Sequence, residues 1–166
     1  MPKKSKELDE LFHDTLKDIY FAEKKLLIAL PKMAKASQNT ELKAAFQKHA
    51  RETEGQVKRL EKVFKMIDAK PQGKNCPAIV GLIEEGQEII KEYKGSPALD
   101  AGLLSGAQAV EHYEISRYGT LRSWAQELGL SEAVTLLQTT LDEEKRTDEI
   151  LTQLAEAVVN QEAEAA

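Results

Sequence analysis

Apolar residues recur every three or four positions along four long stretches of this 166-residue chain. This spacing matches the α-helical period of about 3.6 residues, whereas a half-buried strand would alternate. We therefore predict long helices over residues 5–37, 41–68, 98–128 and 132–159, and a shorter helix over 78–93. The chain is also rich in Ala, Leu, Glu, Lys and Gln, which favour helices. The expected fold class is all-α.

The connections predict how these helices pack. A short break at residues 38–39, where Asn39 or Thr40 is the expected N-cap, joins the first two long helices. Gly129 ends the third long helix, and Ser131 is expected to cap the fourth. Such short loops make neighbouring helices antiparallel, so the sequence predicts two helical hairpins.

A connection of about thirty residues holds the short helix and joins the two hairpins. This up-down, crossover, up-down order is that of a ferritin-like antiparallel four-helix bundle with a long crossover carrying an additional short helix. A plain bundle of five helices without a site is the alternative. We expect one domain over residues 1–166, with its core at about 6–159 and a frayed tail at 160–166.

Composition excludes several classes of partner. The net charge is -5 and no long basic stripe is present, which argues against nucleic acid. No stretch of about 20 apolar residues could span a membrane, and the N-terminal residues lack the apolar segment of a signal peptide. Cys76 is the only cysteine, so no internal disulfide forms. These features predict a cytoplasmic protein.

Polar residues interrupt every long apolar stripe near its middle. On the first helix, Glu23 occupies a position between Ile19 and Leu26 that the periodicity assigns to the core. The corresponding residues of the other helices are His49, Glu52 or Thr53, and Gln56 on the second, Glu111 and Glu114 on the third, and Glu144 and Asp148 on the fourth. Each interruption therefore includes a carboxylate.

These carboxylates are expected to lie at one level of the bundle. In an antiparallel hairpin, two residues are level when the mean of their numbers falls at the loop. The mean of positions 23 and 52 falls at the break of residues 37–38, and the mean of 114 and 144 falls at Gly129. With a rise of about 1.5 Å per residue, an error of two residues shifts the level by only ~3 Å.

Several ionised carboxylates inside a bundle repel one another strongly, and bound cations relieve this repulsion. The pattern suits two metal ions bridged by carboxylates, and oxygen-rich ligands favour Fe or Mn. The candidate metal ligands are Glu23, His49, Glu52, Glu111, Glu114, Glu144 and Asp148. Alternatives to metal binding stay open. A single glutamate on an apolar stripe is often a surface residue, and His49 could be a hydrogen-bonded core histidine.

Five segments of the chain resemble a known family. They are DIYFAEKKLL at 18–27, LPKMA at 30–34, HARETEGQVKRL at 49–60, EHYEISRYGTL at 111–121 and LDEEKRTD at 141–148. In combination they are similar to the YciF/YciE family of ferritin-like, rubrerythrin-like bacterial stress proteins, over about residues 6–159. The resemblance implies a ferritin-like bundle, a tendency to form homodimers and a role in stress.

The wider di-iron pattern is incomplete in this chain. That pattern places a glutamate on one helix and Glu-x-x-His on the next, twice. Glu23 and Glu111 match the single glutamates. The histidine position, three residues after the glutamate, holds Gly55 after Glu52 and Thr147 after Glu144, so neither Glu-x-x-His is intact. The site is therefore expected to be poorer in nitrogen, which leaves ferroxidase or catalase chemistry in doubt.

These observations support three functional hypotheses. The leading one is a dinuclear Fe or Mn protein that handles iron, oxygen or peroxide during stress, and whether it is an enzyme stays open. The second is a non-enzymatic dimeric helical scaffold with a structural metal or none. A storage cage is the third and weakest, because the tail after Val159 is too short for a further helix of the kind that cages use. Three tyrosines lie within a turn or so of the site, Tyr20, Tyr113 and Tyr118. We expect them to be hydrogen-bond partners of its carboxylates; the alternative is that they donate electrons to a metal centre.

Overall fold

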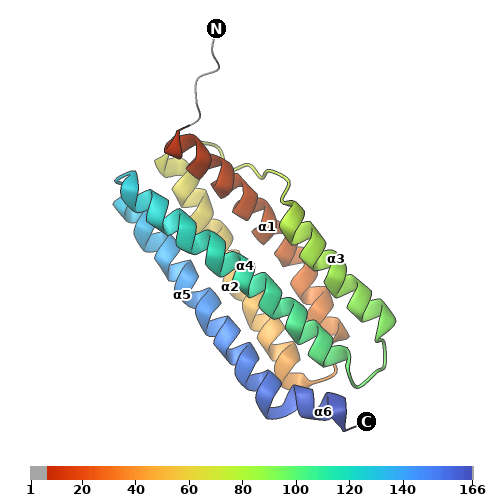
Figure 1. The fold of residues 1–166 in the computed structure, drawn as a ribbon. Helices are drawn as coiled ribbons and strands as arrows, with labels where there is room; N and C mark the ends of the chain where they lie inside the picture. The colour runs from red at the N-terminus through yellow and green to blue at the C-terminus, as the bar shows by residue number, and fades with distance from the viewer. Residues whose placement is uncertain (1–6, 166) are drawn as a thin grey trace.

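The computed structural model describes residues 7–165, and helices account for most of this range. Four long helices form the bundle (Figure 1): α1 (Leu8–Ala36), α2 (Thr40–Met66), α4 (Leu99–Glu127) and α5 (Ser131–Leu154). A shorter helix, α3 (Pro77–Glu92), lies in the crossover between α2 and α4. No strand occurs among the described residues, so the all-α expectation is confirmed.

The long helices pack as two hairpins side by side. Helix α1 packs on α2, and α4 packs on α5, while contacts of α2 with α5 and of α1 with α4 close the bundle. Helix α3 lies along the outside, against α4 and α1 (Figure 1). The core between the helices consists of the apolar stripes, in which Phe12, Leu16, Ile19, Leu42 and Leu121 are among the fully buried side chains.

The start of α4 is tied to the loop of the first hairpin. Asp100, which is 5% exposed, accepts hydrogen bonds from the backbone N–H groups of Gln38 and Asn39 at 2.9 and 2.6 Å. The crossover thus returns the chain to the end of the bundle where α1 and α2 are joined. As a result α4 runs antiparallel to α1, and α5 runs antiparallel to both α4 and α2 (Figure 1).

Two glycines meet specific backbone demands. Gly129 has a φ of 72°, a left-handed conformation that ends α4 without the steric cost of a side chain. Gly73, in the crossover, lies so close to α1 that an added Cβ would be 3.1 Å from the Phe21 Cβ. This contact, with a hydrogen bond from the Lys74 N–H to the Lys17 carbonyl, holds the crossover against α1.

The observed helix ends differ in detail from the predicted ones. Asn39 caps α2 as expected, through hydrogen bonds from the Glu41 and Leu42 N–H groups. The capping role predicted for Ser131 is wrong: Leu130 precedes α5, and Ser131 is its first residue. Positions 5 and 6 of the first expected helix lie outside the described residues.

The C-terminal segment is helical beyond the end expected for α5. A wider π-helical turn, η1 (Ala155–Val159), follows α5 and leads into α6 (Asn160–Glu164), which contacts α4. Residues 160–164 thus form a short helix in the segment where the sequence predicts a frayed tail; Ala166 lies outside the described range.

Candidate metal centre

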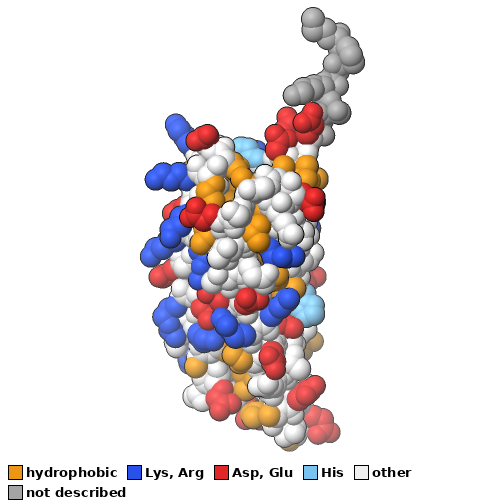
Figure 2. Space-filling view, turned by 90° about the vertical axis from the view of Figure 1, so that its left-hand side faces the viewer, with side chains coloured by type: hydrophobic (Ala, Val, Ile, Leu, Met, Phe, Trp, Pro, Cys, Tyr) orange, Lys and Arg blue, Asp and Glu red, His pale blue; other side chains and the backbone are white. Residues whose placement is uncertain are grey.

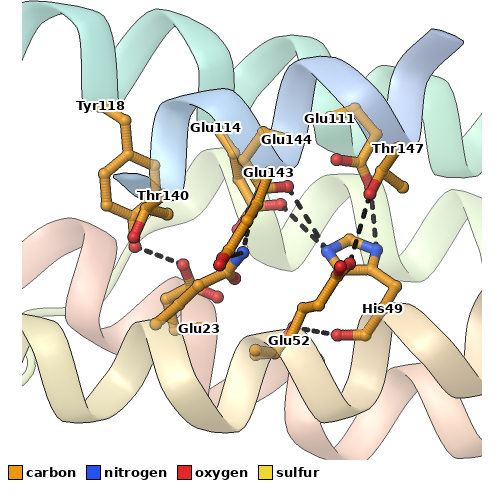
Figure 3. A network of polar contacts seen from close by, with 12 residues as sticks. Glu23, His49, Glu52, Glu111, Glu114, Tyr118, Thr140, Glu143, Glu144 and Thr147 are labelled. Carbon is orange, nitrogen blue, oxygen red and sulfur yellow. Dashed lines mark hydrogen bonds and ion pairs between the residues drawn. The ribbon is translucent and has the colours of Figure 1, made fainter. Parts of the chain in front are cut away.

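Five ionisable side chains lie buried together in the middle of the bundle (Figure 3). They come from all four long helices: Glu23 from α1, His49 from α2, Glu111 and Glu114 from α4, and Glu144 from α5. Each is at most 2% exposed. We call these five residues the buried carboxylate cluster.

The helical period carries these residues into the core. Glu23 lies four positions after Ile19 and three before Leu26, and both neighbours are buried. Glu111 and Glu114 are three positions apart, so they share one face of α4. The polar cluster therefore occupies the same stripes that bury the apolar residues above and below it.

The imidazole of His49 stands among three carboxylates. Its Nδ1 lies 2.8 Å from Glu111 Oε1, and its Nε2 lies 3.5 Å from Glu144 Oε2 and 3.8 Å from Glu114 Oε2. Each of these four residues can offer one ligand atom such that all four atoms lie within 4.8 Å of one another. One nitrogen and three oxygens at this spacing could hold a metal ion.

Glu23 extends the cluster on the α1 side. Its Oε1 accepts a hydrogen bond from the hydroxyl of Tyr118, which is fully buried. The negative charges of Glu23 and Glu144 influence each other across the core. Glu23 is thus a fourth buried carboxylate beside the group centred on His49.

An outer layer of polar residues orients Glu144. The amide of Gln56 donates to Glu144 Oε1 and also to Glu143 Oε2, the latter at 3.2 Å. Arg59 binds both oxygens of Glu143, at 2.6 and 2.8 Å, and also donates to the Thr140 hydroxyl at 3.0 Å. Partners of this kind hold metal-ligating carboxylates in place in metalloproteins.

Many acceptor atoms of the cluster have no hydrogen-bond donor. Both oxygens of Glu111 and of Glu114, one oxygen each of Glu23 and Glu144, and Nε2 of His49 are buried without a hydrogen-bond partner. The contact of His49 with Glu111 has the length of an ion pair but not the direction of a hydrogen bond. Unsatisfied buried acceptors are costly, and a cation would satisfy them. The donor set could therefore hold a metal ion.

Burial and mutual repulsion favour protonated carboxyl groups when no cation is bound. Burial, together with the charge of Glu144, raises the pKa of Glu23 to about 8. The pKa of Glu114 rises well above its usual range through burial and through the charges of Glu144, Glu23 and Glu111. Burial also raises the pKa of Glu111, against the opposing effect of His49. A cation must displace these protons in order to bind.

His49 and Glu144 behave as the charged members of the cluster. Burial alone lowers the pKa of His49, but Glu111 and Glu144 outweigh this effect and raise it well above its usual value. Burial alone raises the pKa of Glu144, but the neighbouring His49 and Glu111 and the Gln56 amide turn the net shift downward. The imidazolium is thus the positive charge that offsets part of the cluster in the metal-free protein.

Glu52 lies at the edge of the cluster. It is partly exposed, with Oε1 3.3 Å from Lys48 Nζ and Oε2 3.5 Å from the Thr147 hydroxyl (Figure 3). Of the two alternatives on α2, the structure buries Thr53 and leaves Glu52 at the boundary of the core. Thr53 donates to the His49 carbonyl at 2.9 Å and so stays on its own helix.

Asp148 lies apart from the cluster. Its oxygens contact Nε2 of His112 at 3.1 and 3.2 Å, and one of them accepts from Gln108 at 3.3 Å. His112 has 69% of its side chain exposed, so this group lies at the surface between α4 and α5. The structure brings five of the seven candidate ligands together, leaves Glu52 at their edge and places Asp148 outside.

Of the three tyrosines expected to donate to the carboxylates of the site, one does so and two donate to carboxylates elsewhere. Tyr118 donates to Glu23, Tyr113 to Asp18 at 2.6 Å, and Tyr20 to Glu61 at 3.1 Å. Only Tyr118 touches the buried cluster. The outer pair of Arg59 and Glu143 was not among the candidates, because both residues lie off the apolar stripe and only the folded chain joins them through Gln56.

Fold and site together define a helical bundle with a buried cluster of one histidine and four glutamates. The chain belongs to the family described as a domain of unknown function, DUF892, whose model matches residues 7–164. It is similar to Protein YciF of Escherichia coli strain K12, with 44% identity over 160 residues that cover 96% of each chain. This confirms the family to which the five sequence segments point.

Solved structures give the same result. The chain matches the crystal structure of the E. coli stress protein YciF with a TM-score of 0.90 at 44% identity, over 95% of this chain and 99% of that one. It matches YcfI of Rhodopseudomonas palustris, described as a proposed structural protein, with a TM-score of 0.85 at 44% identity, over 92% and 97% of the two chains. A Xanthomonas campestris protein at 22% identity shares the fold, with a TM-score of 0.71 over 93% and 95%.

In the described part of the chain, no helix has both the length and the apolar character needed to cross a membrane. On the face drawn in Figure 2, charged side chains of both signs are spread between small hydrophobic areas.

Proposed function

We propose that this protein is a dinuclear metal–carboxylate protein of the ferritin-like kind, which binds Fe or Mn and handles iron, oxygen or peroxide under stress. The order of two hairpins joined by a long crossover is the topology of ferritin-like bundles. The E. coli relative is described as a stress protein, and we extend that association to this chain. A cytoplasmic location and a homodimeric state belong to the same proposal.

One observation carries the metal proposal. Buried oxygens of four glutamates and one imidazole nitrogen face one another without hydrogen-bond partners. A scaffold without a metal would gain stability by replacing them with apolar side chains, because buried unpaired polar groups are costly. A bound cation converts the same atoms into ligands.

The residues divide into roles by position. His49, Glu111, Glu114 and Glu144 would hold one ion, since their ligand atoms already converge. Glu23 is the nearest further carboxylate for a second ion, and Glu52 stands at the edge as an additional oxygen ligand. Asp148 would join only if the α5 side chains rearranged, because it is engaged with His112 in this structure.

A pair of such ions, when bound, supplies electrons to or accepts them from oxygen or peroxide. The chain's own residues prepare the site for this chemistry. Tyr118 orients Glu23 through its hydroxyl, and Gln56 orients Glu144 through its amide. The apolar stripes above and below the cluster exclude water from it.

The test is metal analysis of protein purified without chelator, followed by oxygen and peroxide consumption with Fe(II) or Mn(II). We expect about two ions per chain and oxidant-dependent turnover. A content below roughly one ion per two chains, after loading with either metal, would contradict the dinuclear proposal.

A second candidate is a non-enzymatic dimeric scaffold with a structural metal or none. The description of the R. palustris relative favours it. Metal binding without any consumption of oxygen or peroxide would support this candidate, and gel filtration would separate a dimer from a storage cage.

A further inference from the structure

An apolar cavity lies between α3 and the outer faces of α1 and α4. Its volume is about 50 Å³, and its walls are apolar except for Lys32 and Gln87. These two residues also line a neighbouring surface hollow between α1 and α3, so the cavity and the hollow adjoin on that side. Leu26 of α1 and Val110 of α4 lie among its walls.

Two glycines create part of this space. Gly86 of α3 and Gly106 of α4 line the cavity, and a Cβ added at either position would meet no heavy atom within 4 Å. Gly102 differs, because a Cβ there would lie 2.7 Å from Ile89 Cγ2, so close packing of α3 on α4 requires this glycine. Glycine is among the worst residues for a helix interior, and no contact requires it at positions 86 and 106. What these two residues provide is room.

The volume limits what the cavity can hold. An apolar cavity of roughly 150 Å³ is needed for a benzene-sized molecule, and apolar cavities stay dry because water finds no hydrogen-bond partners in them. A space of about 50 Å³ therefore suits an apolar molecule of very few heavy atoms.

The cavity reaches the neighbourhood of the buried carboxylate cluster. Leu26 lies three positions after Glu23 on one face of α1, and Val110 lies four positions before Glu114 on one face of α4. One helical turn spans about 5.4 Å, so the inner wall is within roughly one turn of two cluster carboxylates. The opposite side faces the surface hollow beside α3.

We propose that this cavity is a binding site for a small apolar molecule of the size of dioxygen, held between the surface and the carboxylate cluster. Binding in the cavity is independent of the metal. Delivery of dioxygen from it to the cluster rests on the proposed function.

Xenon tests the site directly, because it is apolar, close to this size and visible by anomalous scattering. Crystals of the metal-free protein are pressurised with xenon, and the same is done for two double variants. Gly86→Ala with Gly106→Ala adds two methyl groups to the cavity. Gly81→Ala with Gly119→Ala is the matched control, because these glycines are also helical with open space around the Cβ, but do not line the cavity.

We expect xenon in the cavity of the wild type and of the control, and its loss from the lining variant. All four substitutions improve helix propensity alike, so a difference in xenon binding does not come from stability. An empty wild-type cavity, or xenon retained equally in the lining variant, overturns the proposal.

Metal titration of the same proteins separates this proposal from the proposed function. If xenon binds but the protein takes up no Fe or Mn, the cavity stands and the metal centre fails. If metal binds at the same stoichiometry in all three proteins while only the lining variant consumes oxygen more slowly, the cavity also delivers dioxygen. Equal rates in all three restrict the cavity to binding.

Discussion

His49 and Glu111 meet across the diagonal of the bundle, with Nδ1 2.8 Å from Oε1. Helix α2 packs on α1 and α5, and helix α4 packs on α5, α3 and α1, so this pair joins helices from the two different hairpins. In the metal-free protein, His49 is the only cationic member of the buried carboxylate cluster, and this contact keeps it beside the carboxylates. Neighbouring carboxylates without such a partner are left to repel one another.

Glu114 shows this repulsion most clearly. Burial and the charges of Glu144, Glu23 and Glu111 all disfavour its ionised form. We predict that Glu114→Gln stabilises the metal-free protein at pH 8 by roughly 1–3 kcal/mol, because the amide can donate to the carboxylates around it. Denaturant unfolding without metal measures this change.

We predict that bound metal no longer stabilises the Glu114→Gln variant. A ligand at 100 times its dissociation constant stabilises a protein by about 2.7 kcal/mol, so Fe(II) or Mn(II) should raise the wild-type melting temperature and leave that of Glu114→Gln nearly unchanged. Glu54→Gln, an exposed glutamate of α2, is the control and should respond as the wild type does. Equal stabilisation of all three proteins would place the metal elsewhere.

The stability of the metal-free protein is predicted to fall as the pH rises from about 5 to about 8. Glu23 has a pKa of about 8 in the folded state and an ordinary value of 4.5 when exposed. Between these values the folded state holds a proton that the unfolded state has lost, so unfolding releases it and a rising pH favours unfolding. Glu23→Gln should flatten the pH profile.

Tyr118→Phe tests whether the pKa of Glu23 sets this pH dependence of stability. The Tyr118 hydroxyl donates to Glu23 and opposes the rise of its pKa. Without the hydroxyl that pKa rises further, so the loss of stability should extend to higher pH. Bound metal is expected to reverse the slope, because the ligands bind it in their deprotonated form. A pH profile identical in wild type and Glu23→Gln would show that Glu23 does not control it.

The helices and the level of the site follow from the sequence because both depend on simple periods. Apolar spacing places Glu23, Glu111, Glu114 and Glu144 on buried faces, and the antiparallel hairpins bring them to one height. Neither the apolar spacing nor the height of a residue in a hairpin depends on side-chain contacts between helices. The polar residues that interrupt the stripes can therefore be predicted from the sequence as well as the apolar stripes themselves.

The rotation of each helix is harder to predict than its position. Successive residues differ by about 100° around a helix, so Glu52 and Thr53 both lie near the stripe, and only the packing of the folded bundle decides that Thr53 is buried. Thr147 and Asp148 present the same problem on α5, and Thr147 is the one turned inward. The π-helical turn at Ala155–Val159 has no sequence signal that we can identify.

The ligand set can be tested by three single substitutions. We predict that Glu144→Gln weakens Mn(II) binding by more than about 100-fold, that Glu52→Gln weakens it by roughly 10-fold, and that Asp148→Asn leaves it unchanged. The order follows the positions of the side chains, which are central, at the edge and outside the cluster. Isothermal titration measures the affinities.

Circular dichroism of each variant provides the control for folding. Equal losses in Asp148→Asn and Glu144→Gln would mean that Asp148 leaves His112 and enters the site when metal binds. That outcome would restore the ligand set expected from spacing and contradict the role we assign to the observed arrangement.

Asp100 is predicted to control the junction between the hairpins. Its buried carboxylate accepts two backbone hydrogen bonds from the loop of the first hairpin, at Gln38 and Asn39. Asp100→Ala leaves both N–H groups without this partner and should cost roughly 2 kcal/mol, or ~4–8 °C in melting temperature. Asp100→Asn keeps one acceptor oxygen, so its loss of stability should lie between zero and that of Asp100→Ala.

Glu162→Ala, which removes an exposed contact at 3.3 Å to the Asn39 amide, is the control and should change stability by less than about 0.5 kcal/mol. If Asp100→Ala proved as mild as this control, water would replace the carboxylate and the junction would depend on apolar packing alone.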